Sequence, residues 1–240
     1  NDSRSGVLIE IVLIQLVLVI GACLQGLLGL GLGLFSAPIL FLLAPQYVPG
    51  PMILNALLLT MLIAARHRHA IDRQLTAFSM AGGAAGVLAA AVFITSLAFE
   101  HYRVLFGVLI LCAVLLSWVG ARPPINKTTN LIAGSLSGFI GTVTSAGGAP
   151  MGLLYQHAEL KQRNANLSVF FLFINVFGII TLWLTGVSGW QDVLLFLQSV
   201  PALLLGWWLS RYVSRWAHPA CLRHLILLVA FAAGCVTVWW

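Results

Sequence analysis

The sequence predicts an all-α polytopic membrane protein made of two inverted repeats. Of its 240 residues, 60% are hydrophobic and only 8% are charged, whereas a soluble domain carries about 25% charged residues. The charged residues are separated by long uncharged stretches, and two of these stretches share a pattern of glycines followed by proline. This composition excludes a soluble enzyme, a soluble nucleic-acid-binding protein and a disordered chain.

Eight hydrophobic segments follow one another along the chain. A helix that crosses a membrane needs about 20 predominantly apolar residues. The segments cover 7–43, 51–66, 74–97, 102–119, 128–157, 164–185, 191–210 and 220–240. The connections between them are too short to hold another domain, so we expect a single membrane domain with the lipid bilayer as its surroundings.

The first and fifth segments are unusual, because each contains a cluster of glycines before a proline. The first reads GLLGLGLGLFSAP and the fifth reads GFIGTVTSAGGAP. Glycine and proline weaken a helix by about 1 and 3 kcal/mol per residue, so each cluster predicts a helix that breaks and restarts. The length of the fifth segment, 128–157, suits two half-length helices better than two full passes. The longer first segment has room for two tilted passes.

The two halves of the chain match at nearly fixed separations. One constant spacing relates Gly26, Gly29, Ala37 and Pro38 to Gly138, Gly141, Ala149 and Pro150. Later matches, at slightly different spacings, are Asn55 with Asn166, Gly86 with Gly206 and Arg103 with Arg223. The preserved order indicates a duplication, with a first repeat over 7–119 and a second over 128–240. Paired, glycine-interrupted segments are typical of transporters and indicate where the binding site lies.

The basic residues favour a hairpin at each glycine cluster. With eight simple crossings, ten loop Lys and Arg residues would divide five against five between the two faces, which fits poorly with the positive-inside rule. If each cluster enters and leaves on one side, all ten share one face, with only Arg4 and Arg103 opposite. Each half then has three further crossings, which inverts the repeats. We expect the loops 66–73, 120–127, 159–163 and 211–219 to be cytoplasmic.

The paired glycine clusters, one in each half of the chain, resemble those of the TauE/SafE sulfite exporter family. The second cluster keeps Gly147 and Gly148 before its proline, whereas the first has Ser36 where a glycine is common in the family. The resemblance covers essentially the whole chain. It implies secondary transport of sulfite or organosulfonates across the bacterial inner membrane, usually as export.

A helix that restarts inside the membrane is a candidate anion site. Its N-terminus leaves about four N–H groups without an intrahelical partner and carries the positive end of the helix dipole, which suits a sulfite, sulfonate or carboxylate. The candidate starts and their hydroxyl donors are Gly33, Ser36 and Ala37 in the first half, and Thr144, Ser145, Gly147, Gly148 and Ala149 in the second. In the alternative interpretation, the glycines only allow close helix packing.

Uncharged polar side chains inside the segments are further candidate ligands, because buried polar groups are costly in lipid. These are Gln25 before the first break, Asn55 and Thr60 on the second segment, and Asn166 and Asn175 on the sixth. The matched amides Asn55 and Asn166 are the strongest candidates; alternatively they form interhelical hydrogen bonds. No Lys or Arg lies deep in a segment, so we expect binding by backbone dipoles and amides, with modest affinity.

The sequence predicts no cofactor, no metal site and no enzymatic activity. The histidines near segment ends form no buried pair with Ser or Asp, and the arginines around His67 and His69 disfavour a cation. The glycine spacings fit no nucleotide-binding motif. A transporter or channel for another small anion, such as a carboxylate, is the main alternative, and a membrane-embedded enzyme is a more distant one. We expect no nucleic-acid partner, and association into a homo-oligomer is left open.

Overall fold

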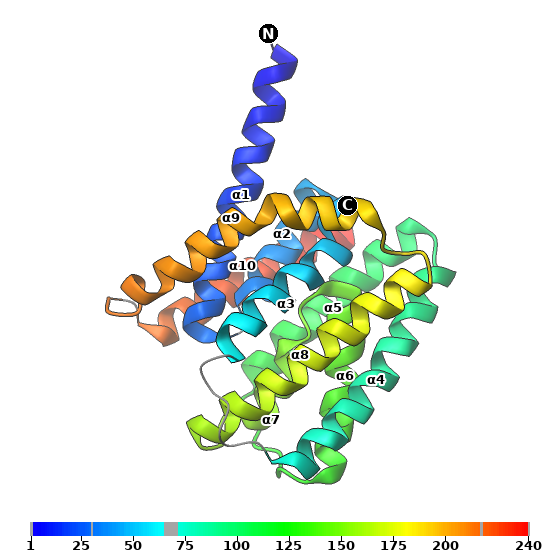
Figure 1. The fold of residues 1–240 in the computed structure, drawn as a ribbon, viewed down its shortest axis with the longest axis vertical. Helices are drawn as coiled ribbons and strands as arrows, with labels where there is room; N and C mark the ends of the chain where they lie inside the picture. Colours follow the sequence, from blue (N-terminus) through cyan, green and yellow to red (C-terminus); the bar gives the residue numbers. More distant parts are fainter. Residues whose placement is uncertain (1, 30, 65–71, 217, 240) are drawn as a thin grey trace.

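The computed structural model describes residues 2–29, 31–64, 72–216 and 218–239, and within these ranges all regular structure is helical. This confirms the all-α prediction. The described helices form one bundle, from which the N-terminal end of the first helix projects (Figure 1). His67, His69 and most of the 66–73 loop lie outside the described residues.

The described residues of the first half form five α-helices and two short turns of other helix types. They are α1 (Asp2–Leu28), a π-helical turn η1 (Leu32–Ser36), α2 (Ala37–Leu43), a 3-10 turn η2 (Pro45–Tyr47), α3 (Gly50–Ala64), α4 (Arg73–Ser96) and α5 (Phe99–Val119). The start of α4 is capped by Asp72, whose carboxylate accepts hydrogen bonds from the N–H groups of Gln74 and Leu75, both at 3.1 Å. Such a cap satisfies donors that a helix start leaves free.

The second half repeats this order of long and short helices. They are α6 (Lys127–Thr144), α7 (Gly148–Tyr155), α8 (Leu160–Leu184), α9 (Trp190–Val213) and α10 (Pro219–Trp239). Among the described residues, α1, α4, α5, α8, α9 and α10 contain the stretches long and apolar enough to cross a membrane. The chain is therefore a multi-pass membrane protein.

Both glycine-rich segments fold back on themselves. In the first, the Ser36 hydroxyl donates to the carbonyl oxygen of Val17 at 3.0 Å, so η1 lies against α1. In the second, the Ser137 hydroxyl donates to the carbonyl oxygen of Gly147, so the start of α7 lies against α6. We call the part that follows each break the returning arm, which is η1 with α2 in the first half and α7 in the second. It is short: the eight residues of α7 extend only about 12 Å.

The two halves are interlocked rather than side by side. Helix α1 packs on α9 as α6 packs on α4, and α3 packs on α9 as α8 packs on α4. Two contacts, α3 with α8 and α5 with α10, join equivalent helices of the two halves. This pairing is consistent with the predicted inverted repeats, in which each packing arrangement occurs twice.

Glycines bring the backbones of α4 and α6 into direct contact. A Cβ atom added at Gly138 would overlap the carbonyl oxygen of Gly83, and one at Gly134 would overlap that of Ser79. Gly82 and Gly86 face α6 in the same way, against the carbonyl oxygens of Leu131 and Ser135. Small residues permit such close approach where lipid supplies no hydrophobic driving force between helices.

Replacing Gly138 with alanine is expected to lower the free energy of unfolding by about 1–3 kcal/mol, the usual cost of overpacking. The added methyl group meets backbone, which cannot rotate away. The matched control is Gly178→Ala in α8, where the nearest atom, the Thr142 hydroxyl oxygen, would be 3.8 Å from the new Cβ. Thermal unfolding in detergent measures both; equal melting temperatures would contradict the close α4–α6 contact.

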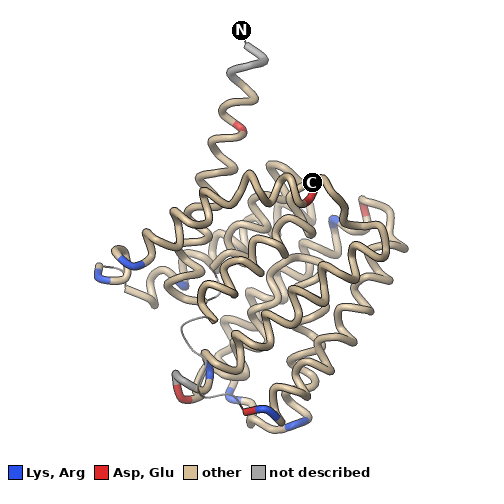
Figure 2. Tube along the Cα trace, viewed as in Figure 1, with Lys and Arg blue, Asp and Glu red and all other residues tan. Residues whose placement is uncertain are grey.

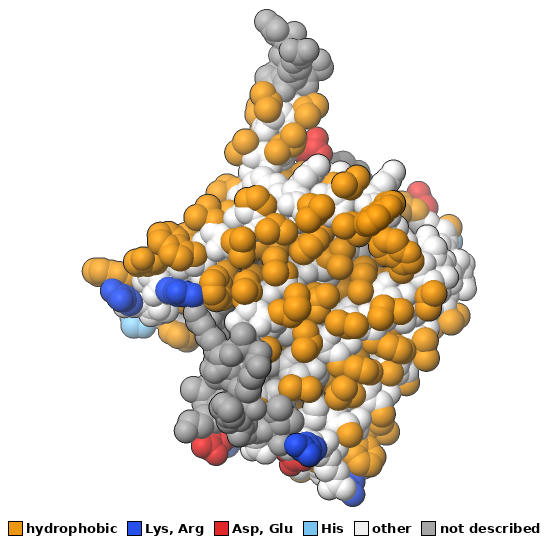
Figure 3. Space-filling model, viewed as in Figure 1, with side chains coloured by type: hydrophobic (Ala, Val, Ile, Leu, Met, Phe, Trp, Pro, Cys, Tyr) orange, Lys and Arg blue, Asp and Glu red, His pale blue; other side chains and the backbone are white. Residues whose placement is uncertain are grey.

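The surface combines a broad apolar area with charges at its edges. Apolar side chains spread over most of the visible face (Figure 3), and most Lys and Arg gather along one edge of the bundle (Figure 2). Of the ten basic residues expected on one side, seven have described side chains: Arg73, Arg122, Lys127, Arg163, Arg211, Arg215 and Arg223. They lie near the helix ends that meet at this edge. Its cytoplasmic orientation stays a prediction.

Candidate functional site

The break in the second half begins directly after α6. Ser145 has a φ of +62°, which is rare for a residue other than glycine and ends the helix. The chain restarts at Gly148, within the range that the sequence predicted. The Thr144 hydroxyl fixes this turn, because it donates to the carbonyl oxygen of Ile140 at 2.6 Å and accepts from the N–H of Ala146 at 3.1 Å.

The break in the first half lies earlier than predicted. Gly29 has a φ of +76° and the helical conformation resumes at Gly31, whereas the sequence suggested a start between Gly33 and Ala37. Gly33 and Ser36 belong to the π-helical turn, and the α-helix α2 begins at Ala37, at the end of the predicted range. The physical reason is that Gly29 takes the left-handed conformation that turns the chain.

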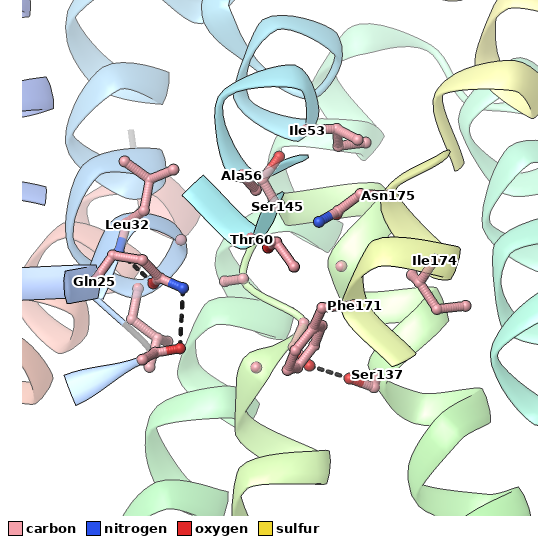
Figure 4. A pocket seen from close by; sticks show the side chains of 17 residues that line it. Gln25, Leu32, Ile53, Ala56, Thr60, Ser137, Ser145, Phe171, Ile174 and Asn175 are labelled. Atoms are coloured by element: carbon pink, nitrogen blue, oxygen red, sulfur yellow. Dashed lines mark hydrogen bonds between the residues drawn. The ribbon is translucent and has the colours of Figure 1, made fainter. Parts of the chain in front are cut away.

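Gln25 bridges the first break. Its side-chain Nε2 donates to the carbonyl oxygen of Gly29 at 3.0 Å, and its Oε1 accepts from the N–H of Leu32 at 3.1 Å. Figure 4 shows the two bonds made by the Gln25 side chain. The amide therefore replaces backbone hydrogen bonds that the break removes.

The π-helical turn that follows the first break contacts the second break at the interface between the halves. A Cβ atom added at Gly33 would overlap the carbonyl oxygen of Ser145 and lie 2.8 Å from the Cα of Ala146. Only a glycine fits between the π-helical turn and this backbone. The contact places both helix interruptions around one point.

A cavity of ≈ 60 Å³ lies at this point. Roughly 10–15 Å³ of such space holds one water, so the cavity has room for an anion of a few heavy atoms. Seven of the predicted site residues line it: Gln25, Gly33, Thr60, Ser145, Gly147, Gly148 and Asn175. Figure 4 shows Thr60 and Asn175 directed toward its centre from α3 and α8.

The lining of the cavity is neutral. No Asp, Glu, Lys or Arg is among the described residues that form it. Gly147 and Gly148, which line it, lie at the start of α7, and N–H groups in the first turn of a helix have no partner within that helix. Together with the Asn175 amide, they provide neutral donors and the positive end of a helix dipole.

Residues 13–237 match the family model described as Sulfite exporter TauE/SafE. The chain belongs to this family. No curated protein and no solved structure gives a significant match. The TauE/SafE proteins are membrane transporters, and the multi-pass architecture of this member agrees with that role.

Five other predicted site residues of this TauE/SafE protein lie outside the cavity lining: Ser36, Ala37, Asn55, Thr144 and Asn166. Ser36 and Thr144 are buried and hydrogen-bonded to backbone, as described above. Asn166 accepts from the Asp72 N–H at 2.9 Å and from the Thr76 hydroxyl at 3.3 Å, so it joins α8 to α4. The Asn55 side chain is fully buried on α3 and donates to the sulfur of Met52 at 3.8 Å.

Sequence reasoning did not single out several lining residues, among them Ser137 on α6 and Phe171 and Ile174 on α8. The duplication contained a signal for Ser137, which follows Gln25 at the same spacing that relates Gly138 to Gly26. Gln25 and Ser137 take equivalent places beside their breaks, since each contributes a side-chain hydrogen bond to the following turn. The apolar residues carried no such signal.

A larger cavity of ≈ 630 Å³ lies next to the neutral cavity and includes arginines of the basic edge of the TauE/SafE bundle in its lining. Gln25, Thr60 and Phe171 line both cavities. We call the larger cavity the vestibule. Its outer wall includes Arg163 at the start of α8 and Arg223 near the start of α10.

Proposed function

We propose that this protein is a secondary transporter that moves sulfite or a small organosulfonate through the neutral cavity, most simply as an exporter. The observation that carries the proposal is the cavity itself, because it lies where the two helix breaks of a TauE/SafE chain meet. Its size suits a small oxyanion, and no acidic side chain lines it to repel one.

The proposed ligands are the backbone N–H groups at Gly147, Gly148 and Ala149, together with the amide of Asn175. A hydrogen bond to a charged group contributes about 1.5–3 kcal/mol, so a few neutral donors hold an anion without trapping it. The other residues with a direct role are those of the cavity wall: Gln25, Gly33, Thr60 and Ser145. Ser36, Ala37, Asn55, Thr144 and Asn166 are proposed to act indirectly, by fixing the breaks and the helices around them.

Transport would follow from alternating access, in which the two interlocked halves move relative to each other around the fixed cavity. The vestibule would be the inward-facing path, with the basic edge in the cytoplasm of a bacterial cell, as the positive-inside rule favours. A neutral cavity binds an anion without requiring a bound cation. The membrane potential would then favour expulsion of the negative charge.

The test is counterflow in proteoliposomes loaded with unlabelled sulfite. We expect saturable uptake of labelled sulfite and inhibition by sulfoacetate or taurine. Saturable counterflow of acetate without counterflow of any sulfur anion would support the carboxylate alternative and overturn the proposed substrate. Protein-free liposomes measure passive leak.

Asn175→Leu is expected to raise the KM for the transported anion roughly tenfold or more, because one hydrogen bond to a charge is lost. The matched control is Val176→Leu, at the next position of α8, where the side chain is exposed on the bundle surface. Initial counterflow rates over a range of concentrations measure the change. An unchanged KM in Asn175→Leu would remove this amide from the site.

A further inference from the structure

The two halves differ in the space between the short returning arm and the last helix. In the second half, the vestibule separates α7 from α10 and is lined by Leu153 on one side and by Arg223 and Ile226 on the other. In the first half, the equivalent helices α2 and α5 are joined by aromatic rings. The space between the returning arm and the last helix is therefore open in the second half and filled by aromatic rings in the first.

The repeat relates the walls of the vestibule to the rings that close the opposite end. At the spacing that relates the two glycine clusters, Phe41 corresponds to Leu153. At the spacing that relates Arg103 to Arg223, the further correspondences between α5 and α10 are Phe99 with Pro219, Tyr102 with Leu222 and Phe106 with Ile226. Four aromatic residues thus occupy the places whose partners are aliphatic or proline in the open half.

Phe41, Phe99, Tyr102 and Phe106 are here called the aromatic cluster; Phe41, Tyr102 and Phe106 are buried, and Phe99 lies at its exposed edge. The ring centroids of Phe41 and Phe106 are 4.1 Å apart, with the planes inclined by 12°. Phe41 also lies 5.9 Å from Tyr102 and 6.2 Å from Phe99. The Tyr102 hydroxyl donates to the carbonyl oxygen of Val143 at 2.8 Å, which ties the cluster to the end of α6 beside the second break.

Arginines stand at equivalent positions in the two halves. Arg223 lines the vestibule and donates one hydrogen bond to the carbonyl oxygen of Ser117 at 2.6 Å, which leaves other guanidinium N–H groups for a ligand. Arg103 is half-buried near the start of α5, at the far end of that helix from Ser117. Helical spacing places Arg103 on the same face as Phe99 and Phe106.

We propose that the aromatic cluster is the closed gate of a second anion path, on the side opposite the basic edge, and that Arg103 is the anion-binding residue at its mouth. The proposal deepens the proposed function and takes from it only the class of ligand, an oxyanion or sulfonate. Separation of α2 from α5 would form the counterpart of the vestibule. The planar guanidinium of Arg103 would then bind the anion by paired hydrogen bonds, as arginine does with oxyanions generally.

The gate is tested by thiol labelling of an Ala56→Cys variant in proteoliposomes, with Cys23, Cys112, Cys221 and Cys235 replaced by serine. Ala56 lines the neutral cavity. The anionic reagent 2-sulfonatoethyl methanethiosulfonate should label it from the basic edge and only slowly from the other side. The liposomes used contain the protein in one orientation, and proteolysis from outside verifies that orientation.

Phe106→Ala in this background should raise the rate of labelling from the far side about tenfold, the size expected for loss of a well-packed ring pair. Phe41→Ala is the second variant, in case the first does not fold. The matched control is Phe231→Ala, whose ring stacks on Trp118 at 6.2 Å between α10 and the opposite end of α5, away from the cluster. Unchanged far-side labelling in both gate variants would overturn the gate.

The role of Arg103 is tested in the Phe106→Ala background. Arg103→Gln should slow far-side labelling by the anionic reagent about tenfold and leave the rate with a trimethylammonium reagent unchanged or higher, because one anion-binding charge is removed. Arg103→Lys should restore much of the anionic rate. Equal effects on both reagents would assign Arg103 a structural role. Labelling requires no sulfite transport, so these results and the counterflow results fail independently.

Discussion

Gly148→Leu is expected to abolish anion transport while leaving the protein folded in the membrane. Gly148 lines the neutral cavity at the first turn of α7, and an isobutyl group there would fill the space proposed for the anion. It would also cover the N–H groups of that turn. Losing two bonds to a charge, at about 1.5–3 kcal/mol each, corresponds to a fall of roughly 100-fold or more in affinity.

Counterflow in proteoliposomes measures this loss, and size-exclusion chromatography in detergent checks the fold. The matched control is Met151→Leu, also in α7, where the side chain is buried and the substitution conserves volume. Near-normal counterflow in Gly148→Leu would contradict a site at the start of α7. Loss of transport in both variants would instead indicate that α7 tolerates no change.

Gly33→Ala should have the second-largest effect, because a single methyl group would overlap the backbone of Ser145. Neither partner is the flexible end of a side chain, so the π-helical turn and the second break would have to move apart. Overpacking of this kind costs about 1–3 kcal/mol. Since the displaced backbone forms the cavity wall, we expect transport to fall much more than stability.

The readouts for Gly33→Ala are the maximal rate of counterflow and the melting temperature in detergent. The control is Ile39→Leu on the same returning arm, which conserves side-chain volume. Unchanged transport with an unchanged melting temperature would show that the halves have more freedom at this contact than the packing indicates.

Much of this fold was predictable because it depends on the local composition of the chain. Uncharged stretches identify membrane helices from composition alone, and the all-helical bundle confirms that prediction. The second break was also located well, because Gly147 and Gly148 stand next to each other shortly before Pro150. Where local helix weakness is concentrated at one point, sequence alone indicates the break.

The first break was harder to locate because weak points are spread along it. Glycines at 26, 29, 31 and 33 all permit a turn, and tertiary contacts decide which one takes it. Gly33 is used for the contact with Ser145, and Gly29 is left to bend the chain. Gln25 illustrates the same difficulty, since its two hydrogen bonds depend on where the break falls.

The interlocked arrangement of the halves has a consequence for biosynthesis. Helix α1 packs on α9, and α4 packs on α6, so the first half emerges from the ribosome before its partners exist. Chains that rely on contacts distant in sequence pass through incomplete intermediates. The glycine face of α4 and the exposed length of α1 therefore remain unpaired, in lipid or in contact with the insertion machinery, until the second half has been synthesised.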